Sequence, residues 1–411
     1  MLRLLLLTIL VSLAMASTPA SAMENQGFIY GTVTLQDGEQ HTGFLRWDSE
    51  EAFWDDLFHS RQNELPWLEH VDMDELQKER KRRYFETHGM FDRVMWTLHN
   101  QDGNLHLSRL FICQFGYLDG IALDEEENVT ILLRGGETVP VHGYSNDVSS
   151  NILVYPAAGD PVEVEWNDLA GISFSPAPTG TAPYAYRLYG TVESTEGTFE
   201  GFIQWDQSEC TSIDMLDGHD QEILMGDIRS ITKNRKGTAD IVLKNGDAFS
   251  MAGTNDVGGG NRGVMVENAA WGRVTVAWKR FQSITFAEGH GSGAGRENFP
   301  GIVPLSGTVT GIEGDTWTGR IVYDLDEAWT RDIFNGENRD LEYDIPFGLI
   351  TSIEKRDDET CRVSLITGHV LDLTDSQDTG GKHAGVLVFE SGEKEARYIP
   401  WSGIDTITLD H

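Results

Sequence analysis

The chain has 411 residues, of which 66 are Asp or Glu and 31 are Lys or Arg, so its formal net charge is −35 at pH 7. An acidic excess this large repels phosphate backbones and argues against nucleic-acid binding. Three cysteines are an odd and sparse set for a disulfide-based fold, and we expect small buried residues at Cys113, Cys210 and Cys361.

The first residues of the chain carry the pattern of a secretory signal peptide. Arg3 precedes an apolar run from Leu4 to Ala16, and small residues come just before Met23. This pattern predicts a signal peptide at residues 1–22 and a mature chain that starts near Met23. The apolar run is too short to span a bilayer. We therefore expect a mature protein in the periplasm or outside the cell.

Most of the remaining chain consists of three copies of one sequence unit. Each copy starts with a Gly-Thr-Val segment: GTVTLQDG from residue 31, GTVESTEG from 190 and GTVTGIEG from 307. A strand-like segment follows and ends in an aromatic residue and an Asp, as GFLRWD, GFIQWD or GRIVYD. Alternating apolar residues interrupted by Asp-Gly or Glu-Gly are typical of β-hairpins.

Each copy then passes through a polar loop and closes with a strand that follows a Trp. The loops read SNDVSSN, TNDVGGGNRG and SQDTGGKHAG. The closing segments begin at Trp166, Trp278 and Trp401, with apolar residues three and six positions later in every copy. Units of this size can bury their own cores, so we expect modules in a row rather than a solenoid.

Two segments rich in Pro, Gly or Ser, residues 175–183 and 288–298, are predicted linkers between the copies. Repeated short strands with regular turn signals predict an all-β fold of three tandem small β-barrel or sandwich modules. We expect these modules at residues 23–176, 184–288 and 301–411.

The first copy is longer because it carries an insertion, at about residues 68–114. Its segment VDMDELQKERKRRYF, from residue 71, has an acidic start and a basic end, which predicts a helix. The part from Met90 onward predicts a hairpin that turns at Asp102 and Gly103. The insertion is therefore predicted to add a helix and a hairpin to the first module.

The predicted helix gathers basic residues in an otherwise acidic chain. Two interpretations stay open for them: a face that is solvated or packed on the protein's own acidic surface, and a docking surface for an acidic partner. The candidate partner-binding residues are Lys78, Arg80, Lys81, Arg82 and Arg83.

Motifs of catalysis are missing from the sequence. The histidines have no zinc-ligand spacing, and no G-x-S-x-G segment occurs. The run GGGNRG from residue 258 matches a dinucleotide motif only formally, because it leads into a strand rather than a helix. We assign no catalytic residue and no cofactor, apart from the calcium candidates that follow.

The repeated carboxylates are the remaining candidates for a site. Hard oxygen ligands suit Ca²⁺, although no EF-hand loop is present. The calcium candidates are the first Asp of each D-x-x-E pattern and the Asp of each polar loop: Asp48, Asp206, Asp324, Asp147, Asp256 and Asp378. The alternative interpretation is structural. In it the Asp and Glu of D-x-x-E close a tight turn, and the loop aspartates satisfy nearby backbone N–H groups.

The GTV…GFIxWD…GTNDV…NRG series resembles a tandem repeat of exported bacterial proteins, over nearly all of the mature chain except the insertion. Its strand and glycine pattern is more loosely similar to SH3-like and Sm-like small barrels. Neither resemblance implies an activity. We predict an exported, non-enzymatic binding or envelope-scaffold protein with a protein or glycan partner. The open alternatives are a hydrolase with an acidic site formed between modules and a calcium-dependent adhesion protein.

Overall fold

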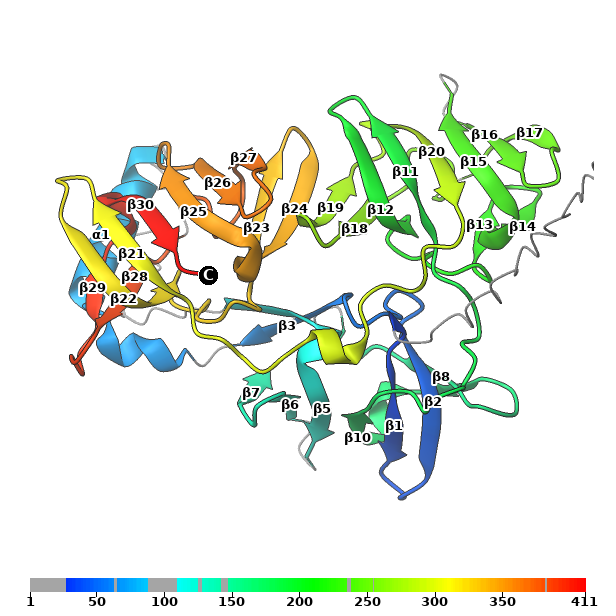
Figure 1. The fold of residues 1–411 in the computed structure, drawn as a ribbon, viewed down its shortest axis with the longest axis horizontal. Helices are drawn as coiled ribbons and strands as arrows, with labels where there is room; N and C mark the ends of the chain where they lie inside the picture. Colours follow the sequence, from blue (N-terminus) through cyan, green and yellow to red (C-terminus); the bar gives the residue numbers. More distant parts are fainter. Residues whose placement is uncertain are drawn as a thin grey trace, which may run out of the picture.

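The computed structural model describes residues 27–62, 65–87, 109–124, 128–141, 147–234, 238–253, 255–380 and 383–411. The predicted signal peptide and most of the predicted hairpin of the insertion lie outside these ranges. Within them the chain is almost all β-structure, with one α-helix, α1 (Met73–Thr87). The predicted all-β fold of repeated modules is confirmed, since each copy builds its own large antiparallel sheet (Figure 1).

The first module has an eight-stranded sheet in the order β7-β6-β5-β10-β1-β2-β8-β9. Its strands are β1 (Tyr30–Leu35), β2 (Gln40–Trp47), β5 (Leu118–Leu123), β6 (Val129–Leu133), β7 (Thr138–Val141), β8 (Ile152–Tyr155), β9 (Val162–Val164) and β10 (Leu169–Phe174). A separate hairpin of β3 (Leu57–Gln62) and β4 (Arg109–Gln114) contributes to the same core.

The second module repeats this order with β11 (Tyr189–Ser194), β12 (Thr198–Trp205), β15 (Ile228–Lys233), β16 (Ala239–Leu243), β17 (Ala248–Met251), β18 (Val264–Asn268), β19 (Gly272–Val276), β20 (Phe281–Ala287) and the hairpin β13 (Met215–Asp217) and β14 (Glu222–Leu224). The third repeats it with β21 (Ser306–Gly311), β22 (Thr316–Tyr323), β25 (Ile350–Lys355), β26 (Cys361–Leu365), β27 (Val370–Leu373), β28 (Val386–Glu390), β29 (Arg397–Ile399), β30 (Ile404–Leu409) and the hairpin β23 (Ile333–Asn338) and β24 (Leu341–Pro346). Short 3-10 helices are η2 (Pro66–His70), η3 (Phe115–Tyr117), η4 (Trp166–Asp168), η5 (Met225–Asp227), η6 (Arg296–Asn298), η7 (Phe347–Leu349) and η8 (Trp401–Gly403).

The aromatic residues that end the strand-like segments of the repeat are buried in every module. Trp47, Trp205 and Tyr323, at the ends of equivalent strands, are at most 1% exposed. The three cysteines are also buried and unpaired, as expected of small apolar residues. The aromatic-to-Asp boundary in the sequence therefore marks the point where a strand leaves the core and turns.

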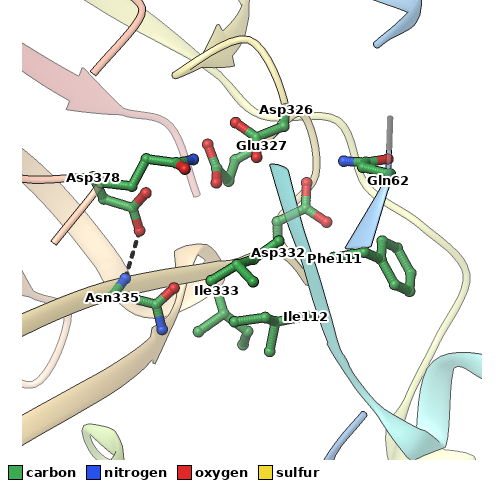
Figure 2. Close-up of a pocket in the computed structure, with 11 residues that line it drawn as sticks. Gln62, Phe111, Ile112, Asp326, Glu327, Asp332, Ile333, Asn335 and Asp378 are labelled. Atoms are coloured by element: carbon green, nitrogen blue, oxygen red, sulfur yellow. Dashed lines mark hydrogen bonds between the residues drawn. The ribbon is translucent and has the colours of Figure 1, made fainter. Parts of the chain in front are cut away.

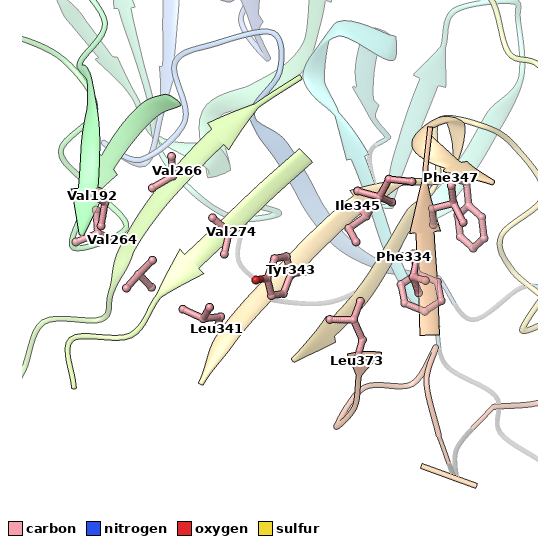
Figure 3. Packing of buried hydrophobic residues seen from close by; sticks show 14 of the residues in the cluster. Val192, Val264, Val266, Val274, Phe334, Leu341, Tyr343, Ile345, Phe347 and Leu373 are labelled. Carbon is pink, nitrogen blue, oxygen red and sulfur yellow. The ribbon is translucent and has the colours of Figure 1, made fainter. Parts of the chain in front are cut away.

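The second and third modules share a sheet. β24 of the third module pairs antiparallel with β19 of the second, from Arg273 opposite Asp344 to Val276 opposite Leu341. Buried side chains from both modules form one hydrophobic cluster across this seam (Figure 3). The expectation of separate modules in a row is therefore wrong here, because a hairpin edge of one module completes the sheet of another.

The insertion begins and ends inside a hairpin of the repeat. β4 pairs with β3 from Gln62 opposite Arg109 to Leu57 opposite Gln114, just as β24 pairs with β23. The added residues therefore lie between Gln62 and Arg109, and the range 68–114 takes in a strand that belongs to the repeat. Sequence similarity between the copies did not fix this register, whereas cross-strand pairing does.

The predicted helix of the insertion is present as α1. Asp72 precedes it, and its Oδ1 accepts a hydrogen bond from the N–H of Glu75 at 3.0 Å, the pattern of an N-cap. In Figure 1, α1 lies beside β22, β28 and β29 of the third module, far from the strands that flank it in the sequence. Among the described residues, no helix combines the length and apolar character that crossing a membrane requires.

Candidate functional site

The D-x-x-E segments form the same tight turn in all three modules. In the first module the N–H of Glu50 donates to the carbonyl of Trp47 at 2.8 Å, and the other two modules have the equivalent bond. Two consecutive residues in each turn have positive φ: Asp48 and Ser49, Asp206 and Gln207, Asp324 and Leu325. This is the geometry of a type I′ hairpin turn, and Asp tolerates the left-handed region better than most residues. Backbone conformation therefore explains the repeated Asp.

The side chains of two of these aspartates bind N–H groups outside the turn that they were predicted to close. Oδ1 of Asp206 accepts from the N–H of Arg262, and Oδ1 of Asp324 accepts from the N–H of Ala384. Both donors lie in the polar loop of the same module, so the turn Asp joins two distant segments of its module.

Local capping belongs to a later aspartate in each copy. Oδ2 of Asp56 accepts from the N–H groups of Ala52 and Phe53 at 2.8 and 2.9 Å. Asp214 and Asp332 make the same pair of bonds in their own modules. The third repeated carboxylate therefore closes the segment that follows the turn.

Each aspartate of the polar loops makes two hydrogen-bonding contacts that stabilise the fold of its module. Their carbonyls accept a hydrogen bond from the core aromatic of the module, at distances of 2.6 to 3.0 Å. Their Oδ2 atoms accept from a backbone N–H of the module's hairpin. The three loop residues are Asp147, Asp256 and Asp378. Each fastens its loop to both the core and the hairpin, in agreement with the structural interpretation.

The glutamates of D-x-x-E lie in buried positions that favour the protonated form of the carboxyl group. Burial raises the pKa of Glu209 to about 8, and the nearby Asp256 adds to the rise. The pKa values of Glu51 and Glu327 are also well above their ordinary value, first because of burial. Oε2 makes no hydrogen bond in any of the three. The protonated form is therefore the one that folding favours.

Arginine side chains couple the first and second modules. Arg46 of β2 donates to both carboxylate oxygens of Asp214. In the opposite direction, Arg273 of β19 donates to Oδ1 of Asp56 at 3.2 Å. Both guanidinium groups are buried, and removal of one member of such a pair costs about 3–5 kcal/mol. The capping aspartates therefore also hold two modules together.

The basic helix is fixed on the third module. Leu76 of α1 is fully buried there, and Oε1 of Glu79 accepts from the N–H of Ser402 at 2.8 Å. Of the candidate partner-binding residues, Arg80 is half-buried and the side chain of Arg83 lies outside the described part, while the exposed ones are Lys78, Lys81 and Arg82.

Aromatic residues strengthen this attachment. The rings of Trp67 in η2 and Phe389 in β28 lie 5.9 Å apart, edge to face. The Arg320 guanidinium lies 4.7 Å from the Trp67 ring and 5.1 Å from the Trp329 ring, which are cation–π distances. The start of the insertion therefore packs against β22 and β28 through these aromatic and cation–π contacts.

A small pocket lies between β4 and the turn of the third module (Figure 2). Its cavity volume is about 40 Å³. One wall is the apolar run Leu110, Phe111 and Ile112, and the other carries carboxyl groups. These are Asp326, Glu327, Asp332 and Asp378. All four belong to the third module, whereas the hydrolase alternative required acids from more than one copy.

The charges at this pocket are unevenly matched. Arg109 of β4 donates to Oδ1 of Asp324 at 3.3 Å, and its Nε lies 3.6 Å from Oδ1 of Asp326. The side chain of Asp326 is 2% exposed and interacts with the neighbouring carboxyl group of Glu327. Burial, followed by repulsion from Asp324, raises the pKa of Asp326 well above the ordinary value. Two carboxyl groups thus share one guanidinium.

The described ranges contain no group of three or more His, Cys, Asp or Glu side chains that could hold a metal ion. The fold does bring the two calcium candidates of a module close, since Asp206 contributes to the raised pKa of Asp256. Calcium binding stays a prediction.

The arginines at the module boundaries were missed by sequence reasoning. Arg187 donates to both oxygens of Asp55 at 2.7 and 2.8 Å, in addition to the pairs made by Arg46 and Arg273. A signal was present, because a charged residue in the strand segment GFLRW occupies a position that alternation places on the outer face. The partner of that charge, however, lies in another copy.

Comparisons with known proteins give no family. No family model matches the chain, and no curated protein matches it. A solved structure described as "Streptogramin B lyase structure" has 11% sequence identity, with 72% of this chain and 94% of that chain covered, at a TM-score of 0.12. A likeness this slight carries no argument about fold or function.

Proposed function

We propose that the chain is an exported, non-enzymatic binding or scaffold protein that holds an anionic partner on the exposed basic face of α1. This face consists of Lys78, Lys81 and Arg82. Export follows from the N-terminal sequence pattern, and the partner is an acidic protein or an anionic glycan. The observation that carries the proposal is a positively charged helix fixed on the surface of a chain with a net charge of −35.

Support comes from the way α1 is held. Leu76 and Glu79 face the third module, so the helix has little freedom to reorient. A charged face that is already ordered loses less conformational entropy on binding than a flexible one. Its charge also favours approach of a partner of opposite sign, at rates that fall with salt.

The repeated acids support a non-enzymatic role in a different way. The turn aspartates Asp206 and Asp324 and the three loop aspartates accept hydrogen bonds from backbone N–H groups of their own modules. Each capping aspartate closes a backbone segment. A residue that a module needs for folding recurs in every copy. A catalytic role would not by itself explain why the same carboxylate occurs in all three modules.

A capture experiment tests the proposal. The mature protein is immobilised and exposed to envelope extract, in parallel with a Lys78→Glu, Lys81→Glu, Arg82→Glu variant. We expect the wild type to retain an anionic partner that the variant loses. Point changes suit this test better than deletion of the insertion, since deletion would expose the apolar face that Leu76 covers.

The matched control reverses exposed charges away from α1, with Arg229→Glu, Lys279→Glu and Arg339→Glu. Capture that survives in the control and disappears in the α1 variant supports the basic face. Capture that survives in both variants refutes it. Protease treatment of the extract beforehand separates a protein partner from a glycan.

A further inference from the structure

Two arginines of this protein lie between aromatic rings, and their surroundings differ in one respect. The Arg187 guanidinium lies 4.1 Å from the Phe53 ring and 4.2 Å from the Phe202 ring. Its Nη1 donates to both carboxylate oxygens of Asp55, at 2.7 and 2.8 Å. The rings hold this guanidinium in place, and the carboxylate accepts its hydrogen bonds and balances its charge.

Arg320 of β22 has the rings without the carboxylate. Its guanidinium lies 4.7 Å from the Trp67 ring, 5.1 Å from the Trp329 ring and 5.7 Å from the Phe389 ring. Trp329 occupies the position in the third module that Phe53 occupies in the first, since each follows the alanine after the D-x-x-E turn. Within the described part of the chain, Arg320 forms no hydrogen bond and no ion pair.

The nearest acid is already bonded to another arginine. Burial lowers the pKa of Arg320, and Glu137 is the group that acts against this shift. Oε2 of Glu137, however, accepts a hydrogen bond from Nη2 of Arg331 at 3.1 Å. The side chain of Arg331 is 2% exposed, so loss of this carboxylate would leave a buried charge unbalanced. Glu137 is therefore committed to Arg331.

The free donors of Arg320 lie on the outer part of its side chain. The residue is half-buried, and of its nitrogen atoms only Nε is enclosed without a hydrogen bond. The two terminal amino groups are consequently open to solvent. Their planar arrangement matches the two oxygens of a carboxylate. A cation that is partly removed from water also attracts an anion more strongly than a solvated one does.

We propose that Arg320 binds a side-chain carboxylate of an acidic partner protein, in the way that Arg187 binds Asp55. The contact between Arg187 and Asp55 supplies the reason for choosing a protein carboxylate, because it joins an arginine held by rings to an aspartate of another module. The rings of Trp67 and Trp329 border the site and suit the methylene groups of such a side chain. None of these residues belongs to the basic face of α1, so either proposal can fail without the other.

Isothermal titration calorimetry on the full mature chain tests the site with a tetraglutamate peptide, acetylated and amidated at its ends. The background is a Lys78→Ala, Lys81→Ala, Arg82→Ala variant, which lacks the basic face of α1. We expect this background to bind the peptide saturably, and addition of Arg320→Gln to weaken the affinity about tenfold or more. The matched control, Arg229→Gln, removes an exposed arginine of the second module and should leave the affinity unchanged.

A more conservative variant keeps the proposal testable if Arg320→Gln does not fold. Arg320→Lys retains the charge and the aliphatic stem but lacks the planar pair of donors, so we expect affinity about threefold or more weaker with an unchanged circular dichroism spectrum. The proposal is overturned if the background variant does not bind the peptide, or if either Arg320 variant binds it as tightly as the background does. Binding of tetragalacturonate in place of the peptide would overturn the assignment to a protein partner.

Discussion

Equivalent outer faces of the second and third modules are covered in opposite ways. In the second module this face carries Gln204 and Arg273, whose partners are the carbonyl of Glu50 and the carboxylate of Asp56 in the first module. In the third module the face is mainly apolar, with Arg320 beside the rings of Trp67 and Trp329, and it is covered by the insertion. Its residues at the equivalent strands include Val322, Leu387 and Phe389.

The difference shows how one folding unit acquires two kinds of neighbour. Strand pairing and core residues are shared by the modules, so the outer face is free to vary without loss of the fold. A charged face requires a partner with fixed complementary charges, which another module's turn supplies. An apolar face requires only apolar area of the right shape, which η2 and α1 supply.

Asp56→Ala should have the largest effect. It removes two backbone caps and leaves the buried Arg273 without one of its carboxylates. We expect the free energy of unfolding to fall by about 3–5 kcal/mol, measured by urea denaturation. Asp160→Ala, at an exposed loop, is the control and should be neutral. A loss no larger than that of the control would show that the charged face does not couple the modules.

Leu76→Ala weakens the apolar contact between α1 and the third module. Truncation of a fully buried leucine destabilises by about 2–5 kcal/mol. We expect this loss to be local, with faster amide hydrogen exchange in β22 and β28 and unchanged exchange in β2 and β8. Lys78→Ala, on the exposed side of the same helix, serves as the control. Unchanged exchange at β22 and β28 would mean that the insertion does not protect that face.

The buried glutamates add a pH dependence to the turns. The pKa of Glu209 is raised by burial to about 8, so the folded protein binds its proton more tightly than the unfolded chain does. The resulting stability is present at low pH and is lost as pH rises from about 4.5 to about 8.

Between pH 5 and pH 8 we therefore expect the melting temperature to drop by several degrees on account of Glu209. Each tenfold difference in proton affinity corresponds to about 1.4 kcal/mol, and ~1 kcal/mol moves the melting temperature of a large domain by about 2–4 °C. Glu209→Gln carries no titrating proton and should show a smaller drop over that range. A variant that follows the wild-type curve would place the proton elsewhere.

Chelation should have the smallest effect. Oδ2 of each loop aspartate already accepts a backbone N–H, and Oδ1 of Asp206 and Asp324 does the same. We expect EGTA to leave the melting temperature unchanged in calorimetry. A fall that added CaCl₂ reverses would instead support the calcium hypothesis and a metal contribution to the turns.

Local backbone signals in the sequence determined the repeated part of this protein. Trp47 followed by Asp48 indicated a strand that leaves the core and turns, and the structure has that arrangement in three places. The helix of the insertion was equally readable, from its acidic start and its basic end, and the structure adds a cap at Asp72. Such features depend on residues a few positions apart, so a single sequence reports them.

Tertiary structure alone decided how the modules meet. The pairing of β24 with β19, the contact of Arg46 with Asp214 and the placing of Leu76 on the third module join residues far apart in the chain. No local preference specifies these partners, because an exposed strand edge, an arginine or a buried leucine can be satisfied at many places. The fold selects the one arrangement that pairs the edge, neutralises the buried charges and covers the apolar face together.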